Sequence, residues 1–329
     1  MTSENTKTNL KNDTPISIEY AYELLKKNVD RVLSTSPLIV REYTSYLAAS
    51  TGKMIRAQAL LTCALNKENK VHPDGVSFAT AIEILHLATL VHDDVIDNSD
   101  LRRGKTSLQK KYGKRTAVIC GDYLLCVALK TAALISDKND YLDRTLPDYM
   151  SKVCLGELGQ HVNNGNFDLS IYRYLKIISG KTAALFEASF HSGAIIMEED
   201  VPHEILREYA KLGRYIGMIF QLTDDCMDFE TTEDVALKPV QSDFEQNVIT
   251  LPLIHALSKE GELRKSALSG NLTRETINNI VESTGGILYT RMLAKKYYNK
   301  AKKIITGLDA SDEKKTRLQE LLEKAYRVF

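Results

Sequence analysis

The sequence predicts an all-α protein, and two observations support this prediction. The chain of 329 residues carries only 7 prolines and 17 glycines, so interruptions are sparse. Between these interruptions, apolar residues recur at spacings of three and four, which gives a helix one apolar face. We find no convincing pair of strands joined by a tight turn. With 43% hydrophobic residues, the chain is long enough to bury a large core.

The expected helices follow one another with short polar breaks between them. In chain order we place them at 17–31, 37–47, 53–66, 77–97, 114–136, 140–163, 170–178, 181–197, 203–229, 246–257, 273–283, 287–306 and 312–326. The breaks are rich in Gly, Pro, Asn and Asp, and none resembles a domain linker. We therefore expect a single domain over 16–329, preceded by a polar tail, 1–15, that we expect to be disordered. The longest break, 230–247, has little apolar content, as functional or disordered loops do.

Charge and cysteine content exclude several classes of protein. Lys and Arg together number 43, as do Asp and Glu, so the formal net charge is zero. No overall field attracts nucleic acid or an anionic membrane, and any anion binding must be local. The five cysteines show no C-x-x-C spacing, and we interpret them as reduced core thiols of a cytoplasmic protein. The N-terminus lacks the apolar stretch of a signal peptide, and no window approaches 18 uninterrupted apolar residues, so we expect a soluble protein.

Residues 91–105 read VHDDVIDNSDLRRGK and place three aspartates where an apolar helix is expected to end. Asp93 and Asp97 are four residues apart, so on a helix they project from nearly the same face, with Asp94 to one side. Three carboxylates in a small volume repel one another unless a cation lies between them, and oxygen-only ligands suit a hard metal such as Mg²⁺. Taken alone, such a motif is more often a solvated helix end.

The segment QLTDDCMDF repeats this pattern as Asp224, Asp225 and Asp228. It again follows an apolar helix, LGRYIGMIF, and again precedes a polar loop. Two helices with carboxylate triads can face each other across one cavity and hold several Mg²⁺ ions there. Because Mg²⁺ keeps part of its water shell and completes its coordination with substrate phosphates, the expected guest is a diphosphate.

Two adjacent arginines follow the first acidic motif. Arg102 and Arg103 come five and six residues after Asp97, in DLRRGKT. The chain can therefore fold back from the helix end and direct guanidinium groups at the same cavity, and Arg is suited to bidentate contacts with phosphate. The alternative interpretation is an ordinary solvated turn.

Two further basic motifs stand at the expected starts of helices. In TGKMIRAQAL, Lys53 and Arg56 are three residues apart and thus near one face. In SGKTAALF, Lys181 and Thr182 follow Gly180 directly. Free backbone N–H groups at a helix start favour anions. Each motif alone is weak evidence of phosphate binding, but together they are more basic helix starts than chance gives.

Three other polar side chains lie beside the acidic motifs. His86 is seven residues before Asp93 on the same stripe, about 10 Å along the helix, and is either a core histidine or a ligand. Gln221, three residues before the second motif, is either a substrate contact or a packing amide. His92 points to another side of its helix, and we interpret it as structural.

Several short motifs occur along the chain in a fixed order: GKMIR, LHLATLVHDDVIDNSDLRRGKT, GDYLL, GKTAALF, QLTDDCMDF, LKPV and TLPLI. Together they resemble the trans-polyprenyl diphosphate synthases, or isoprenyl diphosphate synthases, over about residues 17 to 327. The likeness is to bacterial medium- and long-chain enzymes in particular, such as heptaprenyl and octaprenyl diphosphate synthases. It implies one catalytic domain with the isoprenoid synthase fold, a helical bundle around a central deep cavity, usually as a homodimer.

The resemblance also implies a reaction and a cofactor. The family joins an allylic diphosphate to isopentenyl diphosphate, head to tail, and releases pyrophosphate. The implied cofactor is Mg²⁺, three ions per active site. In the family's usual account the departing pyrophosphate takes the final proton, so we assign no side chain as general base.

By match of motif, the resemblance assigns roles to individual residues. The ligands of Mg²⁺ would be Asp93, Asp94, Asp97, Asp224, Asp225 and Asp228. The residues in contact with the allylic diphosphate would be Arg102, Lys181, Thr182, Gln221 and Lys238. The residues that hold isopentenyl diphosphate would be Lys53, Arg56, His86 and Arg103. The six aspartates and Lys181 are the candidate catalytic residues.

The chain departs from the family pattern after the second aspartate motif. The family commonly reads G-K-P-x-G-K-D and later E-G-K-x-T-L-P, whereas this chain has LKPVQSD and EQNVITLP. Ser242 and Val248 therefore stand where lysines are usual, while Lys238 and Asp243 remain. The loss of two positive charges near the diphosphate lowers the expected activity and leaves open how the loop 230–247 closes.

A stripe that leads away from the first aspartate motif predicts the product length. Thr89, Leu85 and Ile82 lie four, eight and eleven residues before Asp93, so the stripe spans about 16 Å, although ordinary helix packing gives the same spacing. In the family, a bulky aromatic four or five residues before the motif stops growth at short chains, but here those positions are Thr89 and Ala88. The resemblance then favours a C30 to C40 product. We expect the tunnel floor near Leu85 or on the neighbouring helix around Leu125, Leu129 and Thr131.

Several alternatives stay open at this level. The missing lysines also fit a weakly active or non-catalytic subunit of a heteromeric synthase, and geranylgeranyl diphosphate synthase is a shorter-chain alternative. A class I terpene cyclase is disfavoured by the second DD-x-x-D motif, and a purely structural helical protein leaves both motifs unexplained. Transient membrane contact during product release is a hypothesis without support in the sequence.

Overall fold

The computed structural model describes residues 14–49, 52–133, 135, 145–230, 247–259 and 273–327, and within these ranges the protein is almost entirely helical. The helices are α1 (Ile18–Ser34), α2 (Leu38–Ala48), α3 (Ile55–Cys63), α4 (Pro73–Ile96), α5 (Leu108–Tyr112), α6 (Lys114–Ala132), α7 (Leu146–His161), α8 (Ile171–Ile178), the π-helix η2 (Ser179–Ala183), α9 (Ala184–Met197), α10 (His203–Glu230), α13 (Leu251–Lys259), α15 (Arg274–Ser283), α16 (Gly286–Gly307) and α17 (Asp312–Tyr326). The predicted all-α class is confirmed.

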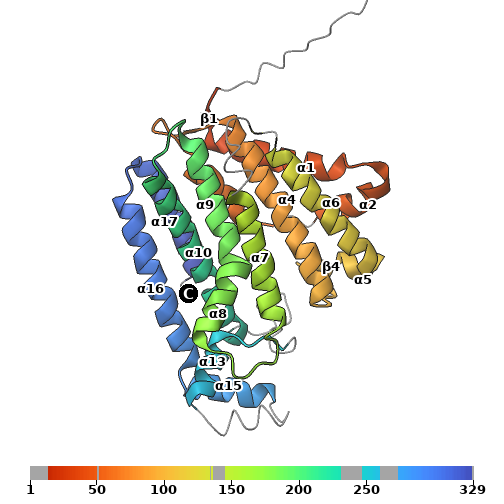
Figure 1. Ribbon diagram of the computed structural model, residues 1–329, viewed down its shortest axis with the longest axis vertical. Coiled ribbons are helices and arrows are strands. Elements are labelled where there is room, and N and C mark those ends of the chain that lie inside the picture. The colour runs from red at the N-terminus through yellow and green to blue at the C-terminus, as the bar shows by residue number, and fades with distance from the viewer. Residues whose placement is uncertain are drawn as a thin grey trace, which may run out of the picture.

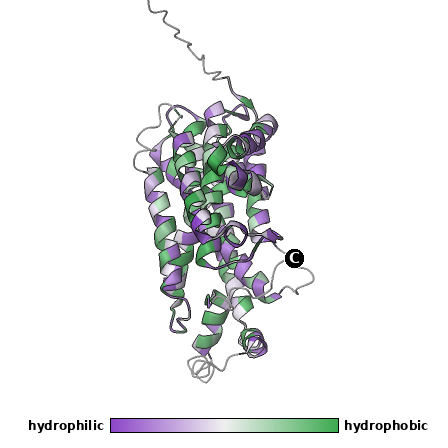
Figure 2. Ribbon diagram, turned by 90° about the vertical axis from the view of Figure 1, so that its right-hand side faces the viewer, coloured by the Kyte–Doolittle hydropathy of each residue, from purple (hydrophilic) through white to green (hydrophobic). Residues whose placement is uncertain are grey.

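The long helices form a bundle whose axes run roughly along the long dimension of the molecule (Figure 1). Helix α4 packs against α6, α3 and α1, whereas α9 packs against α10, α3, α7 and α4. Helices α16 and α17 pack on the side of α10, and α13 and α15 gather at one end. Figure 2 shows hydrophobic residues concentrated on the inner faces of this bundle.

The apolar core has three parts that meet on α9 and α10. One part lies among α1, α3, α4, α6, α7 and α9, the second among α9, α10, α16 and α17, and the third around α8, α10, α13 and α16. Helix α4 is buried on most of its circumference, from Phe78 to Val91. Of the described helices, α4 has the length and composition of a membrane span, but 67% of its most apolar window is buried inside the protein, as in an ordinary core helix.

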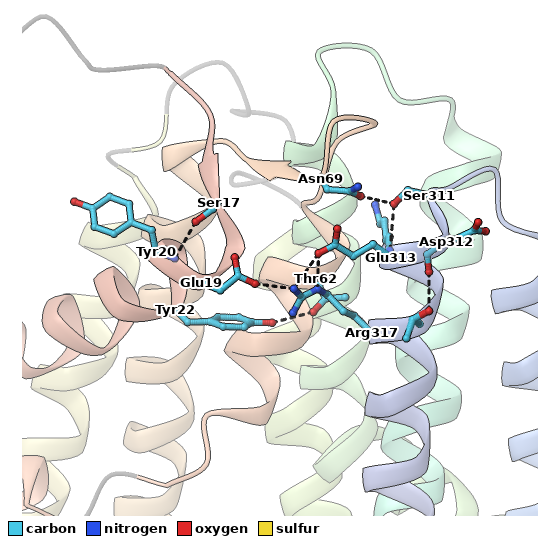
Figure 3. A network of polar contacts seen from close by, with 12 residues as sticks. Ser17, Glu19, Tyr20, Tyr22, Thr62, Asn69, Ser311, Asp312, Glu313 and Arg317 are labelled. Atoms are coloured by element: carbon cyan, nitrogen blue, oxygen red, sulfur yellow. Dashed lines mark hydrogen bonds and ion pairs between the residues drawn. The ribbon is translucent and has the colours of Figure 1, made fainter.

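Helix α17 is fixed to the N-terminal part of the chain by polar contacts (Figure 3). Arg317 donates to Glu19 of α1 at 2.7 Å and to Glu313 of its own helix at 2.9 Å. The Lys314 ammonium, on a residue only 1% exposed, donates to the Cys63 and Leu65 carbonyls at 2.6 and 2.9 Å. These carbonyls lie at the end of α3, so Lys314 satisfies acceptors that the helix leaves unpaired.

The structure contains two short strand pairs that the sequence did not reveal. Strands β3 (Leu101–Arg102) and β4 (Lys105–Thr106) form a short antiparallel pair, and β1 (Ile16–Ser17) pairs with β2 (Lys70–Val71). The turn between β3 and β4 has positive φ at Arg103 (53°) and Gly104 (74°), as a two-residue hairpin turn of type I′ requires. Strands of two residues are too short to show alternation, so the pattern in the sequence had no signal for them.

The predicted helix start at residue 181 was wrong. Helix α8 continues through η2 into α9, and both Ile178 and Ala183 keep helical backbone angles. Gly180 does not end a helix but permits close packing, because a Cβ at this position would lie 2.7 Å from the Lys152 carbonyl oxygen of α7. Lys181 and Thr182 therefore have no free helix N-terminus beside them.

Smaller differences concern helix ends and cysteines. Helix α4 begins at Pro73, four residues before the predicted start, because His72 accepts the Asp74 N–H as an N-cap. Helix α5 was not predicted, and the parts of the expected helices at 134, 136, 140–144 and 246 lie outside the described residues. Cys126 and Cys154 are exposed on α6 and α7, so only three of the five cysteines are core thiols: Cys63, Cys120 and Cys226. Of the predicted tail, 1–13 lies outside the described residues.

Candidate active site

Both aspartate motifs stand at the C-terminal ends of long helices. Asp93 and Asp94 belong to the last turn of α4, and Asp97 is its C-cap. Asp224, Asp225 and Asp228 occupy the last two turns of α10, which ends at Glu230. Carboxylates are disfavoured there because a helix C-terminus carries a partial negative charge. Each motif therefore needs positive charge from another part of the protein or from a ligand.

The β3–β4 hairpin supplies one such charge to the first motif. It turns the chain back so that Arg102 Nε donates to Asp94 Oδ1 at 2.8 Å, and Nη2 donates to the same oxygen. Asp94 is only 4% exposed. Its burial raises the pKa of the carboxyl, and the hydrogen bonds and charge of Arg102 oppose this change.

Lys181 supplies a second charge to the same motif. Its ammonium lies 2.9 Å from Glu157 Oε2 of α7. Burial lowers the pKa of Lys181, but Glu157, Asp93 and Asp97 together outweigh burial and raise it. Burial, Glu157 and Asp97 in turn raise the pKa of Asp93, against the effect of Lys181 and Arg102. The carboxylates here exceed the cations, which leaves this region short of positive charge.

The second motif is held by hydrogen bonds. Asp225 is 1% exposed, and its carboxylate accepts from the Tyr174 hydroxyl and from Gln221 Nε2, the latter at 2.8 Å. Burial raises the pKa of Asp225 to about 7, with further contributions from Asp224 and Asp228, while the two hydrogen bonds lower it. A cation beside such a carboxyl would favour its ionised form.

The π-helix η2 is linked to both motifs, to the second by hydrogen bonds and to the first by charge. The Thr182 hydroxyl donates to Gln221 Oε1 at 2.6 Å, and Gln221 in turn donates to Asp225. The preceding residue, Lys181, interacts electrostatically with Asp93 and Asp97 of the first motif. The acidic ends of α4 and α10 therefore border one site, with consecutive residues of η2 between them.

A separate basic cluster lies deeper along α4. Arg56 Nη1 is 3.1 Å from His86 Nε2, and the guanidinium lies 4.5 Å from the centroid of the Phe186 ring. Burial and the neighbouring arginines keep the pKa of His86 well below its ordinary value. Arg103 packs against Gly52, where a Cβ would lie 2.3 Å from its Nη2. Lys53 is exposed, with its carbonyl bonded to Gln58 Nε2 at 2.7 Å.

Four residues of this region were missed in the sequence. Glu157 pairs with Lys181, Tyr174 donates to Asp225, and Glu83 lies among the arginines of the basic cluster. Arg327, after α17, lies 3.4 Å from Asp224 Oδ1 and 4.5 Å from the centroid of the Phe220 ring. Only Glu83 had a signal, since it precedes His86 by three residues on a helix that is otherwise apolar. The others reach the site from distant segments.

One predicted site residue and four positions discussed with it remain to be placed. Lys238 and Ser242, together with Asp243, lie outside the described residues. Val248 is described and half-buried, just before α13. The His92 Nε2 atom, in a residue interpreted as structural, lies 3.2 Å from Asp122 Oδ1 of α6.

The aspartates fit Mg²⁺ by their chemistry. Their donor atoms are all oxygen, which suits a hard cation. They also lie at helix C-termini, where the partial negative charge of the helix favours a nearby cation. In the part of the chain that the structure describes, no three acidic, histidine or cysteine side chains are grouped closely enough to chelate an ion. Asp94, Asp225 and Asp224 are held instead by the protein partners named above.

A narrow apolar cavity lies further along α4. It is constricted, with a volume of about 10 Å³, which is room for about one water molecule. Its lining consists of Phe78, Ala81, Ile82, Leu85, Ala128, Leu129, Ala132, Leu146 and Met150, from α4, α6 and α7. Of the predicted tunnel residues, Ile82, Leu85 and Leu129 line this cavity. Ala88 is buried, and the Thr89 hydroxyl is bonded to the His86 carbonyl at 2.8 Å; neither lines the cavity.

An all-helical bundle with two acidic helix ends, basic side chains between them and an apolar cavity behind defines a class of enzymes that handle diphosphates with apolar tails. The family model described as "Polyprenyl synthetase" matches residues 37–284. The chain belongs to this family. The predicted enzyme class, a polyprenyl diphosphate synthase, is confirmed.

Individual relatives agree with this assignment. Over 296 residues the chain is 32% identical to heptaprenyl diphosphate synthase component 2 of Geobacillus stearothermophilus. This alignment covers 88% of this chain and 90% of that protein. The crystal structure of heptaprenyl diphosphate synthase from Staphylococcus aureus superposes with a TM-score of 0.85 and 28% identity, over 95% of this chain and 99% of the other. The crystal structure of geranylgeranyl pyrophosphate synthase from Lactobacillus brevis superposes with a TM-score of 0.84 and 28% identity. The match covers 94% of this chain and 97% of the other.

Proposed function

We propose that this chain is a Mg²⁺-dependent, chain-elongating prenyltransferase that joins an allylic diphosphate to isopentenyl diphosphate and releases pyrophosphate. The observation that carries the proposal is the position of η2. Lys181 interacts with the first aspartate motif and Thr182 bonds to Gln221 beside the second, so one diphosphate group can be reached from both helix ends. This arrangement has no evident purpose in a protein without an anionic substrate.

The residue types suit the ionisation of an allylic diphosphate. Mg²⁺, once bound by the aspartates, would neutralise the diphosphate and favour its departure. Arg102 and Lys181 would contribute fixed positive charges at the same place, already oriented by Asp94 and Glu157. The carbocation that remains needs no protein nucleophile. Three Mg²⁺ ions per site remain our proposal, as do the roles of Lys238 and Gln221.

Isopentenyl diphosphate would bind at the basic cluster. Arg56, His86 and Arg103 are placed together there, and Lys53 lies at its exposed side. The two arginines can make bidentate contacts with a diphosphate, and the rigid Phe186 ring below Arg56 limits its movement.

We propose a product of C30 to C40. The positions just before the first motif, Ala88 and Thr89, are small, so an apolar chain can pass them. The apolar cavity begins at Leu85 and reaches Phe78, fifteen residues before Asp93 and about 22 Å along the helix. Geranylgeranyl diphosphate, a C20 product, is the shorter alternative. It would be expected if the growing chain stopped at this cavity.

We further propose a homodimer in the cytoplasm. Helices α6 and α7 expose large apolar side chains, as surfaces that join two subunits do: Ile119, Leu129, Leu155, Leu158 and Val162. A heteromeric synthase is the alternative, since a relative is named as one component of such an enzyme and Val248 replaces a lysine. Transient membrane contact during release of the product remains a hypothesis.

The purified chain alone decides between these alternatives. We expect it to convert farnesyl diphosphate and isopentenyl diphosphate, with Mg²⁺, to linear polyprenyl diphosphates that mass analysis resolves by length. Product formation without a second protein would dismiss the heteromeric subunit. A series that ends at C20 would identify geranylgeranyl diphosphate synthase. No turnover with any allylic primer, alone or with added partner subunits, would overturn the proposal.

The same assay tests the aspartates. Asp225→Asn keeps the shape of the side chain but removes its charge and replaces one of its two acceptor oxygens with an NH2 group, so we expect turnover to fall about a hundredfold or more. Circular dichroism should remain that of the wild type. The control is Asp309→Ala, an exposed aspartate after α16, which should leave turnover unchanged. Wild-type rates for Asp225→Asn would contradict a role in metal binding.

A further inference from the structure

The residue that follows α17 brings a guanidinium to the acidic end of α10. Arg327 Nη1 lies 3.4 Å from Asp224 Oδ1, in the second aspartate motif, and 3.3 Å from Met227 Sδ. The same guanidinium lies 4.5 Å from the centroid of the Phe220 ring. Residues spaced by four and three share one face of a helix, so the side chain of Arg327 lies along one face of α10. The sequence motifs assign no role to Arg327.

The backbone directs Arg327 to this position. Arg327 is the C-cap of α17, its N–H donates to the Glu323 carbonyl at 3.0 Å, and its φ is 40°. This left-handed conformation is common for glycine after a helix and uncommon for arginine. The preceding carbonyl, of Tyr326, accepts from the Thr223 hydroxyl at 3.5 Å, so α10 also holds the backbone here. An unfavourable backbone conformation that is held in this way indicates a function for the side chain.

The contact between Arg327 and Asp224 is looser than the neighbouring ion pair at the end of α10. Arg291 of α16 donates to the Glu230 carboxylate through Nε, at 2.9 Å, and through Nη2. Arg327 presents one nitrogen to Asp224 at 3.4 Å, and the two side chains are 30% and 48% exposed. Such a long and hydrated contact contributes little free energy, so a ligand can replace it.

Two aromatic rings connect Arg327 to the basic cluster. The Phe220 ring contacts the Phe186 ring, with the centroids 5.6 Å apart, and the Arg56 guanidinium lies 4.5 Å from the centroid of the Phe186 ring. Arg327 therefore touches the second aspartate motif on one side and is linked to the cluster on the other. The proposed function places a diphosphate at each of these two sites. Arginine is suited to phosphate, because its guanidinium can donate two parallel hydrogen bonds.

We propose that Arg327 is a further diphosphate-binding residue, which faces Asp224 in the ion-free protein and contacts the allylic diphosphate once Asp224 coordinates a divalent ion. This inference rests on the proposed function for the identity of the ligand. When Asp224 coordinates an ion, the guanidinium loses its partner and can turn to the diphosphate beside it. Because like charges repel and unlike charges attract, Arg327 opposes the binding of a bare ion and favours the binding of the diphosphate.

The variant that tests this is Arg327→Gln, which removes the charge and keeps a polar side chain. In calorimetric titrations, Mg²⁺ alone should bind this variant about threefold more tightly than the wild type. Inorganic pyrophosphate, added at saturating Mg²⁺, should bind about tenfold more weakly. In steady-state assays, KM for the allylic diphosphate should rise by a similar factor, while KM for isopentenyl diphosphate changes less than about twofold. Arg327→Lys should recover part of the loss.

Two further variants complete the test. Lys324→Gln is the control, because it removes an equal charge from an exposed side chain one turn earlier on α17. It should change neither affinity by more than about twofold. Arg327→Gly removes the guanidinium and suits the left-handed backbone, so it should fold and show the same changes as Arg327→Gln.

Three results would overturn the inference. Unchanged affinities in Arg327→Gln and Arg327→Gly would show that the guanidinium takes no part in binding. Weaker binding of both Mg²⁺ and pyrophosphate would show that Arg327 only supports the end of α10. A rise in KM for isopentenyl diphosphate alone would assign the guanidinium to the other substrate. Absence of pyrophosphate binding in the wild type would instead count against the proposed function, which separates the two failures.

Discussion

At the scale of single residues, the site depends on side chains that hold other side chains. Arg102 is oriented by Asp94, and Lys181 by Glu157. In each pair, a basic side chain from a sequence motif contacts an acidic side chain, and this contact helps to fix the orientation of the basic group. The consequence is that substitutions beside the motifs should affect binding without touching the substrate.

Gly52 is such a position. A Cβ there would lie 2.3 Å from Arg103 Nη2, and the guanidinium is the flexible end of a side chain, so it would move rather than the backbone. We expect Gly52→Ala to raise KM for isopentenyl diphosphate about tenfold and to change the free energy of unfolding by less than about 0.5 kcal/mol. Steady-state kinetics and urea unfolding measure the two quantities.

The matched control is Gly307→Ala at the end of α16, where an added Cβ meets no atom within 4 Å. It should leave KM unchanged. If Gly52→Ala also leaves KM unchanged, the position of Arg103 against Gly52 has no part in binding.

The motifs predicted which residue types gather at the site, but not their partners. Spacing along a helix brings Asp93 and Asp97 to one face, and this needs no knowledge of the fold. Glu157 and Tyr174 reach the aspartates from α7 and α8, at sequence distances for which a single sequence has no periodic signal. Glu83 stands in an apolar helix, and an isolated acid there could have been noticed as a buried charge that needs a partner.

At the scale of elements, the contact between α7 and η2 positions Lys181. A Cβ at Gly156 would lie 2.0 Å from the Lys181 backbone nitrogen, and the backbone cannot move aside as a flexible side chain does. We expect Gly156→Ala to lower the free energy of unfolding by about 2 kcal/mol and to reduce turnover, because the two helices must separate. Thermal unfolding and the product assay measure both effects.

Gly159→Ala, three residues later on α7, is the control. Its Cβ would lie 3.4 Å from Ile177 Cγ1, close to an ordinary contact, and alanine also favours the helix. It should be neutral or slightly stabilising. Equal stability of the two variants would contradict the close approach of α7 and η2.

The sequence pattern predicted most helices correctly because their apolar faces are long. It failed where backbone geometry depends on contacts with another segment. Gly180 was interpreted as a break before a helix, but it lies inside a continuous helix that packs tightly on α7. The hairpin at Arg103 and Gly104 is stabilised by two positive φ angles rather than by an alternating pattern.

At the scale of the whole molecule, α17 joins the first helices of the chain to the acidic end of α10. Its N-terminal half is fixed to α1 and α3 by Arg317 and Lys314, and Arg327 follows its C-terminal end beside Asp224. A helix of 15 residues thus connects two ends of the molecule about 22 Å apart. Loosening the buried end of α17 should therefore affect the stability of the entire fold.

Lys314 makes this stability dependent on pH. Burial lowers its pKa from 10.5 to about 8. Between these two values the unfolded chain binds the proton more readily, so the free energy of unfolding should rise as pH increases from about 8 to 10.5. The full effect corresponds to about 3 kcal/mol, which destabilises the folded protein below pH 8. Urea unfolding at several pH values measures the slope.

Lys314→Met should remove this contribution to the slope, and the exposed residue Lys324 provides the control. Lys324→Met should keep the wild-type dependence on pH, since its ammonium is in solvent. The same slope in all three proteins would show that Lys314 titrates alike in the folded and unfolded chains.

Because α4 and α10 both end in carboxylates, the melting temperature of the protein should depend on the divalent ions bound there. If divalent ions bind between α4 and α10, as proposed above, they would offset the negative charge at both helix ends. They should then raise the melting temperature by about 2 °C or more at saturation, with no substrate present. Ranking Mg²⁺, Mn²⁺ and Ca²⁺ by this rise, with Asp225→Asn as the blank, would give the ion preference from calorimetry alone. Equal melting curves with and without ions would mean that these acids are balanced within the chain itself.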